Sequence, residues 1–414
     1  MRNIGIIGGG VVGGGIVNIL RSSALKDSIT ISKICVKNME KKRDWDLPQE
    51  TILINNPYEI INDPEIDLVV EVMGGTELAK DIVFDSIKKG KDVVTANKAL
   101  ISLYLKEIEE LVKEYKVAFG YEAAVCGGIP IIHSLQKDFI ADEITQISGI
   151  INGTTNYILS KMEHNPQISF SQVLQEAQDL GYAEANPSAD VDGYDVRSKI
   201  SILTRLAMGK LVDENSISPM GITKIEQIDF QYANLLNSTI KMIGTAKLID
   251  NKVDIIVSPM LIPKSHLFSN ITGAKNMIEI NSTNLNSTIL MGEGAGRLPT
   301  ANSVVSDIIS IILGNDNKPF SSIKNIELNT NYNRHFYIRL LVNDKIGIIK
   351  TIGDLFEKHR ISIDSIQQIP ITNINRVPFV ITTNNTTIEQ IENVCDEMEQ
   401  LEFVLDKPVS IPVF

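Results

Sequence analysis

The distribution of apolar residues predicts that the chain begins with alternating strands and helices. Apolar runs of strand length cover residues 4–7, 29–36, 67–72 and 92–96, and a longer apolar segment of helical type follows the first run. Short continuous apolar runs are typical of strands that are buried on both faces of a parallel sheet. The first part of the chain is therefore predicted to be a doubly wound α/β domain.

The apolar pattern changes in the second half of the chain. Segments around residues 240–248, 253–261 and 278–280 alternate between apolar and polar positions, which favours an antiparallel sheet. A stretch at 315–334 that is rich in Asn, Ser and Lys indicates a linker. The elements after it are expected in the order strand, helix, strand, strand, helix and a final apolar segment, over 336–342, 346–358, 361–369, 377–382, 388–401 and the last residues.

These changes of pattern predict three domains and a linker. The first is a dinucleotide-binding domain over 1–130, to which a helix at about 299–314 returns. The second, over 131–298, is an α+β domain for catalysis and dimerisation with a mostly antiparallel sheet. A linker over 315–335 precedes a small domain over 336–414. A chain of 414 residues is long enough for about three domains with their own hydrophobic cores.

Composition and charge limit the class of protein. Hydrophobic residues make up 43% and charged residues 22%, which is typical of a globular chain. The net charge of −12 argues against a nucleic-acid partner, which needs a basic face. No uncharged apolar run approaches the ~20 residues that cross a membrane, and the first predicted strand leaves no room for an export signal. We therefore expect a cytoplasmic protein whose Cys35, Cys126 and Cys395 are free, mostly buried thiols.

A glycine-rich turn follows the first predicted strand. Residues 8–13 have the pattern G-x-G-x-x-G and open an apolar helical segment. Gly8 permits a tight turn, Gly10 lets the backbone approach a pyrophosphate, and Gly13 lets helix and strand pack closely. This context predicts a Rossmann-type turn that binds NAD(P) and that includes Val11 and Val12. The alternative is a glycine-rich turn in another kind of α/β protein.

The end of the second predicted strand bears on the choice of cofactor. An acidic residue that accepts the ribose hydroxyls of NAD is expected there, but the sequence places Lys37 and a basic stretch at 41–43 instead. Cations at this position can neutralise a 2′-phosphate, so NADP(H) is the preferred cofactor and NAD(H) the alternative. A solvated basic turn would have the same composition.

Two polar loops follow the third and fourth predicted strands. One contains Gly74 and Thr76, and the other contains Lys98. Ligands of doubly wound sheets bind outside the carboxyl ends of the strands, so both loops are expected to face the cofactor. The alternative for Lys98 is an exposed loop lysine without a function.

The stretch 177–199 has the densest candidate chemistry. Glu184, Asp190, Asp192 and Asp195 crowd together, and Lys199 follows one helical turn beyond Asp195. One carboxylate could bind the ammonium of an amino acid while another holds a lysine ready for proton transfer. An acidic loop followed by a surface Asp-Lys pair is the alternative.

Three further segments are candidates for ligand binding. Residues 121–130 combine an acid with small residues and could bind a monovalent cation through backbone carbonyls, or could form a turn between domains. Residues 147–157 suggest a strand, a polar turn and a helix cap that could bind a carboxylate, or a plain turn. Residues 291–300 contain spaced glycines, including Gly294, before a helix, and these would let the backbone approach a ligand closely or would form a plain tight turn.

Together these segments resemble the homoserine dehydrogenases over nearly the whole chain. Residues 95–98, 149–157 and above all 177–199 look like the motifs of that family in the correct order and spacing. The resemblance implies NAD(P)H-dependent reduction of L-aspartate 4-semialdehyde to L-homoserine, a step towards threonine, methionine and isoleucine. The rivals are another Rossmann-type amino-acid dehydrogenase and a non-catalytic nucleotide-binding amino-acid sensor.

The resemblance also implies roles for individual residues. Lys199 would donate the proton, Asp195 would orient Lys199, and Lys98 would lie beside nicotinamide and substrate. The substrate-binding residues would be Glu184, which receives the substrate ammonium, with Gly153, Thr154, Tyr182 and Asp190. A sodium site would consist of Glu122 and the carbonyls of Val125, Gly127 and Ile129. The chain departs from the usual pattern at Cys126, Asn186 and Leu78.

Residues 336–414 resemble an ACT domain, a small amino-acid-sensing module with the order βαββαβ. Residues 343–347 would form its ligand loop, in which Ile346 replaces the usual proline. The resemblance implies threonine as an allosteric ligand, although a dimerisation module without a ligand is the alternative. Both the ACT-like region and the preceding sheet suggest a homodimer or homotetramer.

Overall fold

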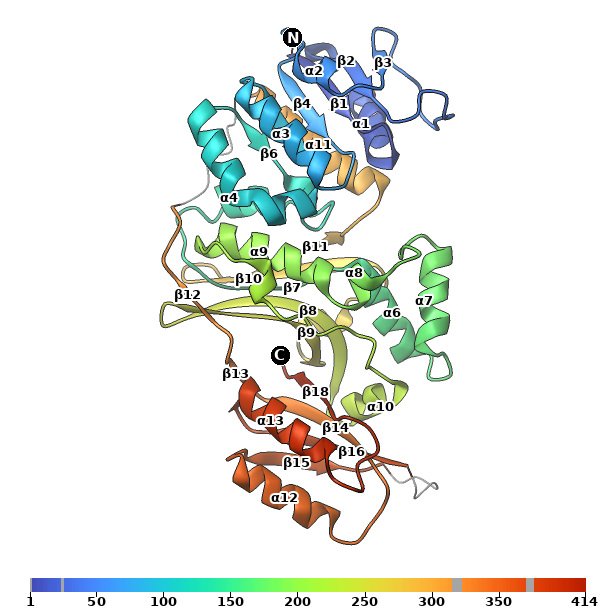
Figure 1. Cartoon of the computed structure of the whole chain (residues 1–414), viewed down its shortest axis with the longest axis vertical. Helices are drawn as coiled ribbons and strands as arrows, with labels where there is room; N and C mark the ends of the chain where they lie inside the picture. Colours follow the sequence, from blue (N-terminus) through green and yellow to red (C-terminus); the bar gives the residue numbers. More distant parts are fainter. Residues whose placement is uncertain (1, 24–25, 315–321, 370–375) are drawn as a thin grey trace. The chain divides into compact units, whose positions relative to one another are not determined.

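The computed structural model describes residues 2–23, 26–314, 322–369 and 376–414 (Figure 1). Contacts between residues divide the chain into two compact units. The first unit contains Met1–Ile147, Ser198–Ser216 and Asn276–Ile326, and the second contains Ser148–Arg197, Ile217–Lys275 and Glu327–Phe414.

A parallel sheet forms the beginning of the chain. Its strand order is β3-β2-β1-β4-β5-β6, and each neighbouring pair is parallel. The strands are β1 (Arg2–Ile7), β2 (Ile29–Cys35), β3 (Ile52–Ile54), β4 (Leu68–Glu71), β5 (Asp92–Thr95) and β6 (Phe119–Gly120). The order reverses between β1 and β4, which is where doubly wound sheets bind their ligands. This confirms the fold predicted from the first apolar runs.

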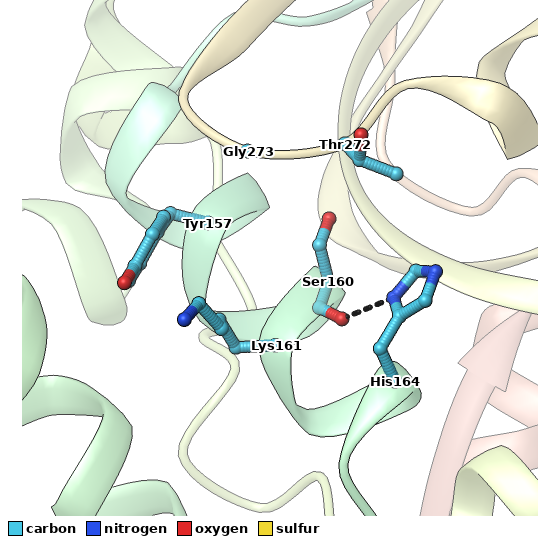
Figure 2. A pocket seen from close by; sticks show the side chains of 6 residues that line it. All are labelled: Tyr157, Ser160, Lys161, His164, Thr272 and Gly273. Carbon is cyan, nitrogen blue, oxygen red and sulfur yellow. Dashed lines mark hydrogen bonds between the residues drawn. The ribbon is translucent and has the colours of Figure 1, made fainter.

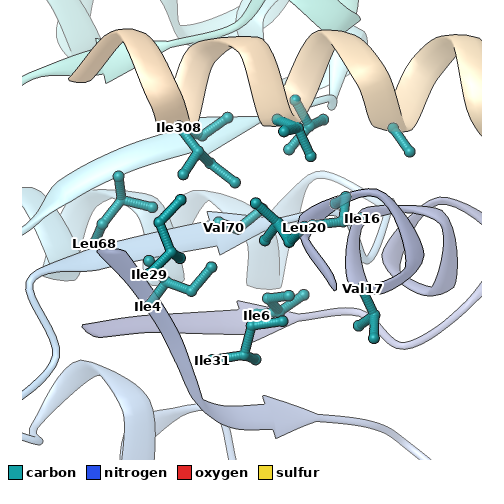
Figure 3. Close-up of a cluster of buried hydrophobic side chains, with 14 of the residues drawn as sticks. Ile4, Ile6, Ile16, Val17, Leu20, Ile29, Ile31, Leu68, Val70 and Ile308 are labelled. Carbon is teal, nitrogen blue, oxygen red and sulfur yellow. The ribbon is translucent and has the colours of Figure 1, made fainter. Parts of the chain in front are cut away.

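Helices cover both faces of this sheet. On one face, α1 (Val11–Ser22) and α11 (Arg297–Ile312) pack against Ile4 and Ile6 of β1, as Figure 3 shows. On the other face, Ile7 packs with side chains of α2 (Tyr58–Ile61) and α3 (Glu77–Lys88). Alternate residues of β1 thus enter opposite cores, which explains the continuous apolar run. A further helix, α4 (Lys98–Tyr115), contacts α3.

A second sheet has the order β11-β10-β7-β8-β9-β12. Its strands are β7 (Ile144–Ile150), β8 (Ser238–Ile249), β9 (Lys252–Pro263), β10 (Lys275–Ser282), β11 (Asn286–Glu293) and β12 (Glu327–Asn329). The long β8-β9 hairpin turns at Asp250 and Asn251, both with positive φ, as a two-residue type I′ turn requires. Because β12 adds to β9 in parallel, the sheet is mixed rather than purely antiparallel.

The helices that accompany the second sheet include those that carry the candidate substrate residues. They are α5 (Ile131–Lys137), α6 (Gly153–His164), α7 (Phe170–Asp179), α8 (Ser188–Val191), α9 (Tyr194–Met208) and α10 (Gln227–Leu235). Within the second unit, α6 contacts α7, α8, α10 and β8.

The last part of the chain forms a four-stranded antiparallel sheet with two helices. Its order is β15-β16-β14-β18, from β14 (Phe336–Val342), β15 (Ile363–Gln367), β16 (Val377–Thr383) and β18 (Val409–Pro412). Side chains of α12 (Ile348–Lys358) and α13 (Ile388–Glu399) share one hydrophobic core with the sheet. This agrees with the predicted βαββαβ order.

The predicted linker is partly structured. Residues 315–321 lie outside the described residues, but β12 and β13 (Asn333–Arg334) lie within the predicted 315–335, and β13 pairs with β17 (Thr386–Thr387). Among the residues that the structure describes, no helix combines the length and apolar character that crossing a membrane requires.

The cysteines are free and buried, as expected from the sequence. Burial raises the pKa of the Cys35 thiol to about 11 and that of the Cys395 thiol to about 12. Because the thiolate is the reactive form, we predict that neither thiol is labelled by a disulfide reagent at pH 8 in the native protein. Labelling in denaturant gives the total number of thiols, and a Cys126→Ser variant leaves Cys35 and Cys395 as the thiols to be labelled. Rapid labelling of the folded Cys126→Ser variant would contradict the prediction.

Candidate active site

The glycine turn after β1 packs closely against neighbouring backbone at two of its glycines. Gly8 has a φ of +122°, and a Cβ added there would lie 2.5 Å from the carbonyl oxygen of Val72. A Cβ added at Gly13 would lie 1.9 Å from the carbonyl oxygen of Gly8, so a side chain at either position would force the turn apart. A Cβ added at Gly10 meets nothing within 4 Å. The turn is therefore open where a pyrophosphate would approach.

The start of α1 also suits a phosphate group. Gly10 is the N-cap of α1 and has no side chain to bond the first N–H groups of the helix. Val11, the first helical residue, is 66% exposed, and Val12 packs against the hydrophobic core of the sheet. The exposed N-terminus of a helix attracts anions because its N–H groups and its dipole point outwards. These features fit a dinucleotide cofactor.

The basic segment after β2 is exposed at Lys37 and at Lys41 and Lys42. Arg43 is tied down, because its guanidinium donates to the carbonyl oxygens of Asn38 (2.5 Å) and Lys41 (2.8 Å). The lysines thus form the exposed cationic part of this segment.

A buried carboxylate that was not singled out in the sequence connects the two polar loops beyond β4 and β5. Glu71, the last residue of β4, is fully buried, and its side chain accepts from the Met73 N–H (2.9 Å) and the Thr95 hydroxyl (2.7 Å). Asn97 donates to the Gly75 carbonyl (2.7 Å) and caps α4, whose first residue is Lys98. In the sequence, the one indication of this role was a single acidic residue at the end of an apolar strand. The loop with Gly74 and Thr76 is thereby fixed to the loop with Lys98.

In the second unit, Asn152 brings two of the candidate acids together. Its amide nitrogen donates to a carboxylate oxygen of Asp190 (2.7 Å) and of Asp195 (2.8 Å). Its amide oxygen accepts from the Thr155 N–H (2.8 Å) and so caps α6. Asn152 and Asp195 are each only 4% exposed, so the bond between them lies out of water, whereas the bond with Asp190 is partly buried. The sequence suggested a helix cap here but gave no sign of the link to Asp190 and Asp195.

The first turn of α6 is joined to the segment that carries Tyr182 and Glu184. The Thr154 hydroxyl donates to the Tyr182 carbonyl (2.6 Å), and a Cβ on Gly153 would lie 2.6 Å from the carbonyl oxygen of Ala274. The carbonyl of Glu184 accepts from the Gln178 amide (3.0 Å), while the residue itself is exposed. The backbone around Glu184 is therefore held, and its carboxylate is open to a ligand.

Helix α9 places Asp195 in its first turn and Lys199 one turn later. Residues four apart lie on one face of a helix. Lys199 is only 8% exposed, so the side chain is buried and does not face bulk water. Lys98 and Lys199 belong to the first unit, and Asn152, Asp190 and Asp195 belong to the second.

The segment after β6 has a buried carboxylate at its centre. Both oxygens of Glu122 accept backbone N–H groups at the start of α5, from Ile132 (2.9 Å) and His133 (2.6 Å). Burial raises the pKa of Glu122 to about 7, although the charge of His133 opposes the shift. Asp307 of α11 accepts from the Glu122 N–H (2.9 Å) and pairs with the His133 ring (2.7 Å). This arrangement ties three segments of the first unit together.

The other residues of the predicted cation site lie in the turn that follows. Cys126 and Gly127 have φ of +55° and +41°, so the chain turns sharply here. The Gly127 carbonyl accepts from the Ser303 hydroxyl (2.6 Å) and the Ile129 carbonyl from the Ile131 N–H (2.8 Å). Each carbonyl oxygen retains a second lone pair, so the oxygen set is compatible with a cation. Among the described residues, no group of three or more His, Cys, Asp or Glu could hold a metal ion.

Gly294 also lies in a crowded environment. A Cβ there would lie 1.4 Å from the side-chain oxygen of Asn276, so close packing already accounts for this glycine.

A cavity of about 300 Å³ lies along α6 (Figure 2). Its charged groups are already engaged, because the Lys161 ammonium and the Tyr157 hydroxyl both donate to Glu176 (2.8 and 2.5 Å). The His164 ring bonds the carbonyl of Ser160 (2.7 Å), as the dashed line in Figure 2 shows. The described residues that line it include none of the candidate catalytic residues. We therefore do not assign the reaction to this cavity.

Comparison with known proteins decides the family. The model for homoserine dehydrogenase matches residues 130–309, and the model for its NAD-binding domain matches 8–122. The homoserine dehydrogenase of Bacillus subtilis (strain 168) is 36% identical, covering 97% of this chain and 95% of that protein. The chain belongs to the homoserine dehydrogenase family. The enzyme of that name from Synechocystis is 37% identical, covering 99% of each chain.

Solved structures and a third family model agree with this assignment. The homoserine dehydrogenase from Thiobacillus denitrificans superposes with a TM-score of 0.92 at 33% identity, covering 100% of this chain and 98% of that one. A model for the ACT domain matches residues 336–402. The predicted family is thus confirmed. A homoserine dehydrogenase is an NAD(P)-dependent oxidoreductase that acts on a CH–OH group.

Proposed function

We propose that Lys199 donates the proton to the aldehyde oxygen when L-aspartate 4-semialdehyde is reduced to L-homoserine, and that Asp195 orients Lys199. The observation that carries this proposal is the buried amide of Asn152, which fixes Asp195 one helical turn from the buried Lys199. The bound nicotinamide supplies the hydride. Negative charge then develops on the substrate oxygen, and an ammonium nearby stabilises that charge and gives up a proton.

The second unit would hold the substrate by the two charged groups on its α-carbon, the ammonium and the carboxylate. Glu184 presents an exposed carboxylate to the substrate ammonium, a charge-assisted contact, and Asp190 and Tyr182 lie in the same segment. Gly153 and Thr154 lie at the N-terminus of α6, which favours the substrate carboxylate. Two contacts at the α-carbon would fix the orientation of the substrate, leave the aldehyde at its other end free to meet Lys199 and the nicotinamide, and so reduce the entropic cost of reaction.

The cofactor would be held by the first unit. Its proposed contacts are Gly8, Gly10, Val11, Val12, Gly13, Lys37, Gly74, Thr76, Lys98 and Gly294. Preference for NADPH rests on the exposed Lys37, which can neutralise a 2′-phosphate. Lys98, at the start of α4, would lie beside nicotinamide and substrate.

A monovalent cation such as sodium is proposed for the turn that contains Glu122, Val125, Gly127 and Ile129. Support comes from the buried carboxylate of Glu122 and the sharply turned carbonyls after it. Because burial raises the pKa of Glu122 to about 7, a cation nearby would favour its charged form. Activity and melting temperature measured in sodium and in a bulky organic cation would test this proposal.

The ACT domain is proposed to bind threonine and thereby to restrain catalysis in a pathway that leads to threonine, methionine and isoleucine. A cavity of about 170 Å³, suited to a small amino acid, is lined by Val342, Asp344, Lys345, Gly347 and neighbours in β16 and α12. Asp344 offers a negative charge to a zwitterion, and Lys345 offers a positive charge once it leaves its exposed ion pair with Glu402 (3.1 Å). Calorimetry with threonine on the whole chain tests the binding, and light scattering tests the proposed homodimer or homotetramer.

The reaction itself is tested by following nicotinamide absorbance with L-aspartate 4-semialdehyde and NADPH, and in reverse with L-homoserine. We expect turnover in both directions, with a higher kcat/KM for NADPH than for NADH. Binding of both nucleotides without turnover would instead favour a nucleotide-binding sensor.

We predict that Glu184→Gln raises the KM for homoserine by about tenfold or more, because the substrate ammonium loses a charged partner. The KM for the cofactor should not change. Glu357→Gln, which alters an exposed acid of α12 in the ACT domain, is the matched control. An unchanged KM for homoserine in the Glu184 variant would disprove this role.

A further inference from the structure

Helix α10 of the second unit is bonded directly to the ACT sheet. Tyr232 of α10 is fully buried. Its hydroxyl donates to the carbonyl oxygen of Pro378 (2.6 Å) and accepts from the N–H of Ile369 (3.1 Å). The hydroxyl group of Tyr232 therefore donates one hydrogen bond and accepts another.

The two backbone groups that bond Tyr232 belong to residues next to those that line the ACT cavity. Pro378 stands between Val377 and Phe379, and both of these line the cavity. Ile369 directly follows Gln368, which also lines it. The Tyr232 hydroxyl thus joins two segments of the cavity wall, one after β15 and one in β16.

A second contact anchors the start of α10 to β14 of the same sheet. The Arg339 guanidinium donates to Asp229 (2.8 Å), Glu226 (3.2 Å) and the Lys224 carbonyl (3.0 Å). The Tyr337 hydroxyl also donates to Asp229 (2.7 Å). Asp229 is fully buried and Arg339 is 5% exposed, so the contact is shielded from water. Helix α10 cannot move independently of the ACT sheet without breaking these bonds.

The segment before α10 leads to the acids of the candidate site. Ile222 donates its N–H to the carbonyl of Val191 (2.8 Å), and a Cβ on Gly221 would lie 2.4 Å from the same oxygen. Val191 follows Asp190, whose carboxylate is bonded to Asn152. A shift of α10 would therefore press on the backbone next to Asp190.

From these contacts we propose that Tyr232 is a positioning residue that couples occupancy of the ACT cavity to the Asp190–Asn152–Asp195 cluster. The proposal rests on the proposed binding of an amino acid in that cavity. A ligand that moves either wall segment breaks a bond of a buried hydroxyl, which water cannot replace, or else moves α10 with it. In both cases the contacts that support Asp190 differ between the ligand-bound and ligand-free states. This difference in contacts gives the two states different free energies and so couples the cavity to the cluster.

Tyr232→Phe tests the coupling, because it removes only the hydroxyl. Its matched control is Tyr337→Phe, which removes a buried hydroxyl from the same interface without a bond to the cavity wall. We expect the Tyr232 variant to bind threonine within about threefold of the native Kd and to keep its basal kcat and KM. Inhibition by saturating threonine should fall by about tenfold, within the usual span of coupling energies, and should persist in the control.

Hydrogen exchange of residues 187–195 supplies a readout that needs no ligand. We expect faster exchange in Tyr232→Phe than in the native protein, and no such change in Tyr337→Phe. Undiminished inhibition by threonine in a folded Tyr232→Phe enzyme would overturn the proposal. If the native chain does not bind threonine, the proposed sensing by the ACT domain is wrong. In that case, exchange of residues 187–195 that is the same in Tyr232→Phe as in the native protein would overturn the proposed coupling as well.

Discussion

Replacing Lys199 with Ala is expected to lower kcat by about 10²- to 10⁴-fold, the usual effect of removing a positioned proton donor. The reason is that the variant loses both the proton and the positive charge that stabilise the developing oxyanion. Steady-state kinetics with L-homoserine and NADP measure the effect. Because the role is confined to the transition state, the KM for homoserine should change much less than kcat.

Lys199→Arg separates the two contributions of this lysine. It keeps a positive charge on the helix, but a guanidinium does not give up a proton near neutral pH. We therefore expect its kcat to remain well below that of the native enzyme. An effect of Lys199→Ala on KM alone, with kcat preserved, would remove Lys199 from the chemical step.

Replacing Arg339 with Met should lower the free energy of unfolding by about 3–5 kcal/mol, the usual cost of leaving a buried charge without its partner. Asp229 is fully buried, and among the described residues its carboxylate would keep its hydrogen bonds with Tyr337 and the Glu226 N–H. Denaturation by urea measures the change. Arg376→Met is the matched control, because Arg376 pairs with Asp406 in solvent and should have a much smaller effect.

The loss of stability in Arg339→Met should also depend on pH. Burial raises the pKa of Asp229 above its ordinary value, while Arg339 holds the pKa down, so the variant raises it further. A carboxyl with a raised pKa in the folded state stabilises at low pH, and this stabilisation is lost as the pH rises through that pKa. The free energy of unfolding of the variant should therefore be closest to that of the native protein at acid pH. A difference that narrows as the pH rises would contradict this reasoning.

Local patterns predicted most of the secondary structure because they report burial directly. Strands such as β1 are apolar on both faces, and the glycine spacing of residues 8–13 admits few other conformations. The short β3 and β12 were missed because three residues are too few to show a period. The second sheet is mixed because it contains the parallel pair of β12 and β9, which no local pattern indicates.

The candidate site was predictable in its residue types but not in its connections. The acids of 177–199 stand out in the sequence, yet the link through Asn152 joins residues about 40 positions apart. The bond between His133 and Asp307 spans 174 positions. Such contacts depend on how distant elements pack, so neither composition nor spacing reveals them. The sequence therefore predicts which groups are available, and the fold determines which of them meet.

The late position of α11 in the chain has a consequence for biosynthesis. This helix supplies Val304 and Ile308 to the core of a sheet whose strands all come from the first 120 residues. On the ribosome, the first six strands would leave the exit tunnel with one apolar face covered only by α1, until about two hundred more residues had been translated. The nascent chain should therefore need chaperone protection during this interval, and fragments that stop before α11 should aggregate when expressed alone.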